Sequence, residues 1–271
     1  MDAFPSSELI QKSLKEQFCI QVPFGLSSMK IQEAVTAFLA FLNEPDTIKT
    51  RISFSIAPKH RRGDVGYVRR DAQNHVYDDS KEFFHYHPAI TERHPDLVTG
   101  EDAFSDFLKK ADVIWNAAYE TVWRLLSELE DRFPGIRGKV FDTKDVHLMI
   151  RFLKYEWQNS GTYLAKPHFD AGSFTLAIAE SAPGLRIGSN PKDLRPITHE
   201  KDKAIFMLSS NFRTMMDSGE FSAGWHDVIQ TNESQIGQAY ARWAVVAFVE
   251  AHGAEALPRS VTHRWVHENV V

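Results

Sequence analysis

The chain has 271 residues, of which 43% are hydrophobic and 25% charged, and its formal net charge is −5. These values are typical of a soluble globular protein, and the negative charge argues against a nucleic-acid-binding protein, which normally carries a basic face. The one cysteine, Cys19, excludes an internal disulfide and a cysteine-rich zinc or iron–sulfur site. The N-terminus lacks the layout of a signal peptide, and no window approaches the roughly 20 apolar residues of a membrane span, so we expect a cytoplasmic protein without a membrane partner.

The first part of the chain is predicted to be mainly helical. A serine at position 6 or 7 can cap a helix that runs to Lys15, and residues 18–22 form a short apolar strand around Cys19. Apolar residues three or four positions apart then predict an amphipathic helix over residues 30–43 and a long helix over residues 101–133. Residues 58–101, between these two helices, are polar and irregular.

After residue 145 the pattern changes from helix to strand. Short apolar or alternating segments are separated by turn residues such as Ala182-Pro183-Gly184. Several short strands in succession predict a sandwich or a barrel. With the helices before them, they predict an α+β protein built around one closed sheet system, without a clear domain boundary. The predicted strands are HLMIRFLKY, TLAIA, LRIG, KAIFML, HDVIQ and ARWAVVAFV.

A histidine and an aspartate lie two residues apart in KPHFDAGSFTLAI, residues 166–178. In an extended strand side chains alternate, so His168 and Asp170 project from the same face. Two neighbouring polar groups on an inward face are costly to desolvate unless something binds them, and a metal ion is the obvious binding partner. A facial triad of two histidines and one carboxylate is typical of non-haem Fe(II) oxygenases.

The third ligand of such a triad has two candidates, His226 and His263. His226 is followed, sixteen residues later, by Arg242 at the start of an apolar strand. His263 has eight residues after it, too few for a further strand pair. We therefore predict that His226 is the ligand, and that His263 belongs to a tail packed outside the barrel or folded back as a lid. His199 lies in a polar turn and is predicted to be a surface residue.

Residues 147–188 resemble the central strand block of the isopenicillin N synthase-like 2-oxoglutarate/Fe(II) dioxygenases. That block has a strand ending in tyrosine, a loop, His-x-Asp, a Thr-Leu strand and a Gly-Leu turn. Residues 18–26, Gly66-Tyr67 and residues 78–86 are similar to N-terminal segments of the same family, so the resemblance covers most of the chain. The matching positions of the central block are Tyr155, His168, Asp170, Thr175, Leu176, Gly184 and Leu185.

The resemblance implies a single domain over residues 1–271, with a mainly helical region (1–144) and a jelly-roll, or double-stranded β-helix, core (145–271). It implies Fe(II) bound by His168, Asp170 and His226. It also implies 2-oxoglutarate as cosubstrate, bound by Arg242 and Tyr155, and O2 as the oxidant. The implied reaction is oxidation, most simply hydroxylation, of a small molecule, with release of succinate and CO2.

The chain departs from the family at two points. Arg242-Trp243-Ala244 stands where the family has Arg-x-Ser, so a hydroxyl donor to the cosubstrate is missing, and the spacing from His226 to Arg242 is longer than usual. Three functions therefore stay open: the 2-oxoglutarate-dependent oxygenase, a 2-oxoglutarate-independent oxidase or cyclase of the isopenicillin N synthase type, and a non-catalytic cupin-like binding protein. Desaturation and ring closure also stay open beside hydroxylation.

Residues that contact the small-molecule substrate are harder to predict, and the sequence names neither that substrate nor the oligomeric state. Arg186 alternates with Leu185 and Ile187, so it either points into the cavity toward an anionic substrate or forms a surface salt bridge. Further candidates for substrate contact are Tyr163, Tyr67 and Arg69.

Overall fold

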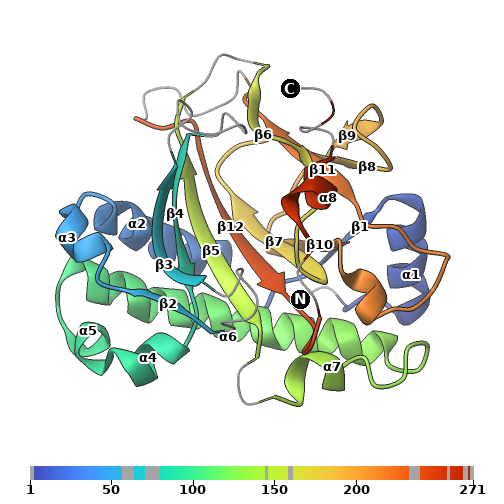
Figure 1. Cartoon of the computed structure of the whole chain (residues 1–271), viewed down its shortest axis with the longest axis horizontal. Coiled ribbons are helices and arrows are strands. Elements are labelled where there is room, and N and C mark those ends of the chain that lie inside the picture. The colour runs from blue at the N-terminus through green and yellow to red at the C-terminus, as the bar shows by residue number, and fades with distance from the viewer. Residues whose placement is uncertain are drawn as a thin grey trace.

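The computed structural model describes residues 3–56, 64–70, 80–143, 146–157, 161–231, 239–254, 257–264 and 268. Within them, two antiparallel β-sheets face each other, and helices cover the outer face of the larger sheet (Figure 1). The larger sheet has eight strands in the order β1-β10-β7-β12-β5-β4-β3-β2, and the smaller has four in the order β6-β11-β8-β9. The expected α+β fold with a double-stranded β-helix core is confirmed.

The strands of the larger sheet are β1 (Cys19–Pro23), β2 (Ser53–Ser55), β3 (Asp64–Arg70), β4 (Lys81–Tyr86), β5 (Leu148–Tyr155), β7 (Phe174–Glu180), β10 (Lys203–Leu208) and β12 (Arg242–Val249). Those of the smaller sheet are β6 (Tyr163–His168), β8 (Leu185–Gly188), β9 (Leu194–Pro196) and β11 (Trp225–Ile229). The turn from β7 to β8 contains Gly184, whose φ of +143° and close approach to the Ile229 carbonyl leave no room for a Cβ.

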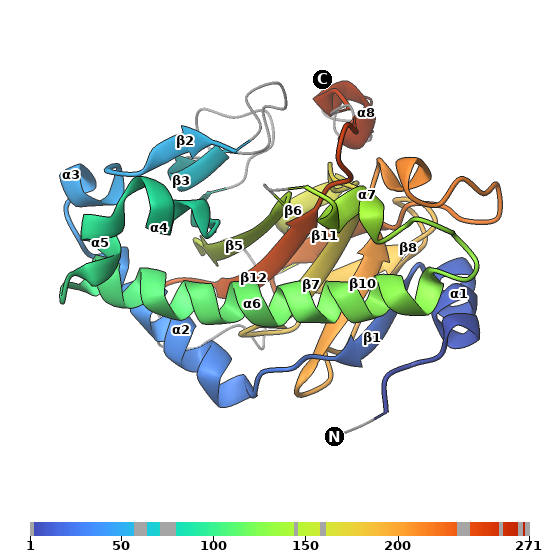
Figure 2. The same ribbon diagram turned by 90° about the horizontal axis from the view of Figure 1, so that it is seen from below.

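The helices are α1 (Ser7–Glu16), α2 (Ser28–Phe41), α3 (Asp46–Lys49), α4 (Ala89–Arg93), α5 (Pro95–Thr99), α6 (Ala103–Leu129), α7 (Gly138–Phe141) and α8 (Arg259–Thr262), with a 3-10 turn at Phe212–Thr214. Figure 2 shows α6 lying across the larger sheet, with α2 beside it. Side chains cap three of the helices: Ser6 begins α1, Ser27 begins α2 and Asp102 begins α6. No helix in the described ranges is long and apolar enough to cross a membrane.

The hydrophobic core forms two clusters, one on each side of the larger sheet. The outer cluster fills the space between the sheet and the helices, where Phe41 of α2 stacks on Phe104 and Phe107 of α6 at ring-centroid distances of 4.6 and 5.3 Å. Such aromatic pairs contribute about 0.5–1.5 kcal/mol each beyond their burial. The inner cluster lies between the two sheets and contains Leu153, Ala244 and other small or branched side chains. Cys19 belongs to the inner cluster and is buried in β1, as predicted.

The N-terminal region contributes more to the sheet than the sequence predicted. Residues 3–143 supply β1, β2, β3 and β4, of which only β1 was expected, and the polar segment 58–101 contains β3 and β4. The expectation of an irregular segment was wrong there for a physical reason. β4 is buried on both faces, and β3 carries exposed charges near the edge of the sheet, so neither shows the alternation of a half-buried strand.

Candidate metal centre

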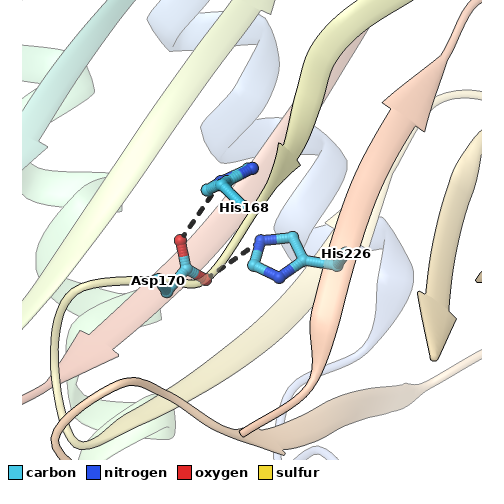
Figure 3. Close-up of side chains that lie close together, drawn as sticks. All are labelled: His168, Asp170 and His226. Carbon is cyan, nitrogen blue, oxygen red and sulfur yellow. Dashed lines mark ion pairs between the residues drawn. The ribbon is translucent and has the colours of Figure 1, made fainter. Parts of the chain in front are cut away.

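His168, Asp170 and His226 meet at one end of the space between the sheets. His168 ends β6, His226 lies near the start of β11, and the two are direct partners in the antiparallel register. Asp170 follows in the loop to β7. One ligand atom from each residue can be chosen so that all three lie within 4.8 Å of one another. Figure 3 shows the Asp170 carboxylate facing both imidazole rings, whose centroids are 4.3 Å apart.

Each histidine is held by a backbone carbonyl two residues earlier in the chain. His168 Nδ1 donates to the Lys166 carbonyl at 2.7 Å, and His226 Nδ1 lies 3.4 Å from the Gly224 carbonyl. Because a carbonyl can only accept, these contacts place the proton on Nδ1 and leave Nε2 as the unprotonated atom. The Nε2 atoms face the carboxylate, at 3.7 Å from His168 to Asp170 Oδ1 and 3.4 Å from His226 to Oδ2.

Two buried hydroxyl groups orient the carboxylate. Thr175 Oγ1 donates to Asp170 Oδ2 at 2.8 Å and lies 2.7 Å from Ser209 Oγ. Since the Thr175 proton is used on the carboxylate, Ser209 is the donor to Thr175. Partners of this kind fix the orientation of a ligand side chain and are needed for tight metal binding. Thr175 was singled out in the sequence only as part of a motif, and Ser209 was missed because it follows a different strand.

The electrostatics of the three residues favour a bound cation. Burial acts to raise the pKa of Asp170, but the neighbouring His226 and His168 hold it well below its usual value. Burial and His226 lower the pKa of His168, whereas the Asp170 carboxylate outweighs burial and raises that of His226. An anionic carboxylate with two inward Nε2 atoms is a donor set that fits Fe(II), and three protein ligands leave coordination positions open. The residues therefore fit the metal that the sequence implied.

His263 lies beside this group but not in it. Its ring stacks on that of His168, with centroids 5.0 Å apart and an interplanar angle of 18°. Just before it, the Thr262 carbonyl at the end of α8 accepts a hydrogen bond of 2.8 Å from the Phe169 amide, within the His-x-Asp turn. Thr262 and His263 therefore contact the turn that carries the candidate ligands, while the choice between a tail outside the barrel and a folded-back lid stays a prediction.

Arg242 and Tyr155 are direct partners across β12 and β5. The guanidinium of Arg242 lies 6.0 Å from the Tyr155 ring centroid, and Arg242 is only 3% exposed. Nε donates to the Ala182 carbonyl at 2.9 Å, and Nη2 forms an ion pair with Glu180 at the end of β7. No hydrogen bond among the described residues uses Nη1. The structure thus brings the two expected cosubstrate residues together and adds Glu180, which the sequence did not reveal as a partner.

Arg186 and Tyr163 lie on the outer face of the smaller sheet. Leu185 and Ile187 point into the inner cluster, so Arg186 between them points away from it. Its guanidinium binds Asp227, which is fully buried, through two hydrogen bonds of 2.8 and 2.6 Å. Hydrogen bonds to Asp227, and to a smaller extent Tyr163, raise the pKa of Arg186. Of the two alternatives for Arg186, the structure shows the salt bridge and not the cavity.

Tyr67 and Arg69 face the helices and not the candidate metal centre. The Tyr67 hydroxyl donates to Glu82, and its ring meets Phe41 of α2 edge-on at 6.2 Å. Arg69 is the register partner of Glu82 and shares this outer face. The structure therefore does not bring either side chain to the three ligand candidates, in contrast to the expectation of substrate contact.

No protein-family model and no curated protein sequence matches the chain. Solved structures do match. A full-length protein from Neurospora crassa, in complex with alpha-KG and thymine, superposes with a TM-score of 0.70 over 96% of this chain and 85% of its own, at 14% identity. The dioxygenase for auxin oxidation 1 from Arabidopsis thaliana, in complex with 2-oxoglutarate, gives a TM-score of 0.67 over 91% and 90%, at 16% identity. The dioxygenase for auxin oxidation from rice gives 0.66 over 91% and 81%, at 15% identity.

Identities this low establish the fold and not the activity. The similarity extends over nine tenths or more of this chain in each case. The chain thus has the double-stranded β-helix fold that is found in 2-oxoglutarate-dependent oxygenases.

Proposed function

We propose that the protein is an Fe(II)- and 2-oxoglutarate-dependent oxygenase that oxidises a small molecule, most simply by hydroxylation, with release of succinate and CO2. The observation that carries the proposal is the convergence of His168, Asp170 and His226, with both Nε2 atoms directed at one carboxylate. The fold shared with proteins solved in complex with alpha-KG or 2-oxoglutarate supports it.

The residues of the chain have separate roles in this proposal. His168, Asp170 and His226 hold the metal, and Thr175 with Ser209 keeps the carboxylate in place. Bound Fe(II) supplies the activation of O2 and the oxidation of cosubstrate and substrate, which no side chain can perform. The apolar side chains of the inner cluster, between the two facing sheets, would help to exclude water from this chemistry.

Arg242 and Tyr155 are the proposed cosubstrate residues. A guanidinium can bind a carboxylate through two nitrogen atoms, and the edge that contains Nη1 is not used by Ala182 or Glu180. The Tyr155 ring flanks the guanidinium and lies in the inner cluster. The distal carboxylate of 2-oxoglutarate would therefore meet an arginine whose orientation is already fixed.

The test is the release of succinate from 2-oxoglutarate by purified protein, over pools of small molecules, with and without Fe(II). Succinate should form only with Fe(II), and Asp170→Ala should abolish it. Asp193→Ala, which removes an exposed carboxylate in the loop before β9, is the matched control and should keep full activity. Undiminished turnover in Asp170→Ala would end the proposal.

Two features of the site favour a second candidate, the 2-oxoglutarate-independent oxidase. Ala244 stands at the position of the expected serine donor, and Glu180 already neutralises Arg242. Such an enzyme would consume O2 with a substrate and Fe(II) but without 2-oxoglutarate. A protein that binds small molecules without consuming O2 under either condition would be the non-catalytic binding protein.

A further inference from the structure

We propose that a cavity on the helical side of the larger sheet, which we call the outer cavity, binds a small neutral molecule with a flat apolar body and a carbonyl-type hydrogen-bond acceptor. Its volume is about 460 Å³, and small-molecule sites typically have roughly 300–1,000 Å³. The residues that define it here come from α2, from β7 and the turn after it, and from the start of β12: Ile31, Ile178, Ala179, Glu180, Ser181 and Trp243.

The outer cavity lies on the opposite face of the larger sheet from the candidate metal centre. Ile178 of β7 and Trp243 of β12 belong to the outer hydrophobic cluster, whereas their neighbours Ala177 and Ala244 belong to the inner one. Side chains alternate between the two faces along a strand, so the sheet separates the outer cavity from the space between the sheets. The site is therefore distinct from the proposed catalytic site and does not depend on the proposed function.

The walls of the outer cavity nearest the core are apolar. Ile31 of α2 and Ile178 of β7 are buried, and Ala179 beside them is too small to fill the space. A flat apolar ligand lying against these side chains would be withdrawn from water, which contributes about 25 cal/mol for each Å² of apolar surface removed. The walls thus favour a hydrophobic body over a polar one.

Two hydrogen-bond donors of the outer cavity have no acceptor. The Trp243 amide donates to Ser181 Oγ at 3.0 Å, and the Ser181 amide donates to the Trp243 carbonyl at 3.1 Å, so the backbone of the two residues is fixed. The indole Nε1 of Trp243, which is only 7% exposed, and the hydroxyl proton of Ser181 donate to no other group among the described residues. Because a buried indole N–H usually has a partner, an acceptor on the ligand would complete the site.

The charged groups of the outer cavity already have partners, which favours a neutral ligand. Its lining contains two lysines and three carboxylates, those of Glu180, Glu200 and Asp202. Glu180 forms an ion pair with Arg242, and Glu200 forms one with a lysine of β10. Asp202 accepts the first amide of α2 at 2.8 Å. An anion would face these carboxylates, and a cation would have to displace their present partners.

Glu180 is the point of contact between the outer cavity and the proposed cosubstrate site. It lines the cavity and also pairs with Arg242, whereas Arg242 itself is not among the described residues that line the cavity. A ligand of the outer cavity should therefore bind together with 2-oxoglutarate and not in its place. This distinction is part of the test.

The experiment uses four compounds with the same bicyclic body: indanone, which has a carbonyl group, its parent hydrocarbon indane, the anion indane-carboxylate and the cation aminoindane. Each is titrated into protein with isotope-labelled tryptophan, and NMR follows the indole N–H signals of the six tryptophans. Trp243→Phe removes the donor and identifies its signal, and Ala179→Leu fills the cavity. Trp123→Phe is the matched control, because Trp123 is a half-exposed tryptophan of α6 outside the cavity lining.

Indanone should shift the indole signal of Trp243 and leave that of Trp123 in place. It should bind about threefold or more tightly than each of the other compounds, because it alone offers an uncharged acceptor. Trp243→Phe should reduce its affinity to that of indane, Ala179→Leu should weaken both neutral compounds, and Trp123→Phe should change neither. Thermal melting checks that each variant is folded, and Ala179→Leu decides the matter if Trp243→Phe is not.

Four results would overturn the proposal: the Trp243 signal does not move, an ionic compound binds more tightly than indanone, the affinity survives in both cavity variants, or saturating 2-oxoglutarate with Zn(II) displaces indanone. The last result would make the cavity part of the cosubstrate site. Binding should be the same on metal-free protein and on Asp170→Ala, so a failure of the proposed function would leave the outer cavity standing.

Discussion

Replacing Arg242 by methionine should destabilise the fold as well as remove the cosubstrate contact, and the two effects can be separated. Arg242 and Glu180 form an ion pair whose side chains are only 3% and 8% exposed. Removing one partner of a buried pair leaves an uncompensated charge and costs about 3–5 kcal/mol. Since domains have about 5–15 kcal/mol of stability in total, Arg242→Met alone could lose activity by unfolding.

The double variant Arg242→Met/Glu180→Met resolves this ambiguity. Replacing both members of a buried ion pair by apolar side chains is often neutral or stabilising. The unfolding free energy from urea titration should therefore fall by about 3–5 kcal/mol in Arg242→Met and return to within about 1 kcal/mol of wild type in the double variant. The double variant is then a folded protein that lacks the guanidinium.

Binding of 2-oxoglutarate to the double variant completes the test. Anaerobic titration of the Fe(II) protein, followed by the charge-transfer band of the chelated cosubstrate, should show an affinity loss of about 2 kcal/mol or more, because a charge-assisted contact to a buried anion is missing. Strictly additive stability losses would refute the ion-pair argument. Wild-type affinity for 2-oxoglutarate in the double variant would refute the role of Arg242.

Three further predictions concern the surroundings of the site and the fold. Thr175→Val, which keeps the shape but removes the donor to Asp170, should weaken Fe(II) binding about 10–100-fold in a metal titration, and an unchanged affinity would show that the hydroxyl does not orient the ligand. Because burial raises the pKa of Cys19 to about 11, iodoacetamide at pH 8 should label it only after unfolding; labelling of the native protein would contradict its burial. Burial acts to raise the pKa of Glu82, but hydrogen bonds from Lys154 and Tyr67 hold it below the usual value of about 4.3. The ionised Glu82 carboxylate therefore stabilises the fold above that value, and this stabilisation is lost as the pH falls through the lower folded pKa. At pH 7 the unfolding free energy of Glu82→Gln should be about 3 kcal/mol below that of the wild type. The difference between the two proteins should shrink toward zero below pH 4, and a difference that does not change with pH would contradict this reasoning.

The sequence predicted the strands of the C-terminal half because their signal is local. Segments such as LRIG and KAIFML alternate or are apolar, and turn residues separate them, so β8 and β10 follow from periodicity. β3 and β4 could not be predicted in this way. Their burial is set by the helices and strands packed on each side, and their residues show no period of their own.

The candidate ligands could be predicted because spacing and strand order constrain them. His168 and Asp170 share a face, and only His226 precedes a strand long enough to complete the sheet; the structure makes His226 the register partner of His168. Contacts between distant segments had no such signal. The ion pair between Glu180 and Arg242 forms because the end of β7 lies beside the start of β12 in the fold, and local spacing in the sequence does not predict this.

The direction of Arg186 was undecided for a related reason. Alternation with Leu185 and Ile187 places the three side chains on two faces, but it does not say which face is the inner one. The deciding residue is Asp227 on the neighbouring strand, which is buried and binds the guanidinium. Sequence periodicity along one strand does not reveal a partner on the neighbouring strand.

Iron content after anaerobic reconstitution, measured for His226→Ala and His263→Ala side by side, tests the central claim most directly. Both rings lie against His168, at centroid distances of 4.3 and 5.0 Å, so both substitutions remove an imidazole from the same neighbourhood. If His168, Asp170 and His226 hold the metal, His263→Ala should keep about one Fe(II) per chain and His226→Ala should lose most of it. Iron retained in His226→Ala and lost in His263→Ala would contradict the assignment of the metal centre.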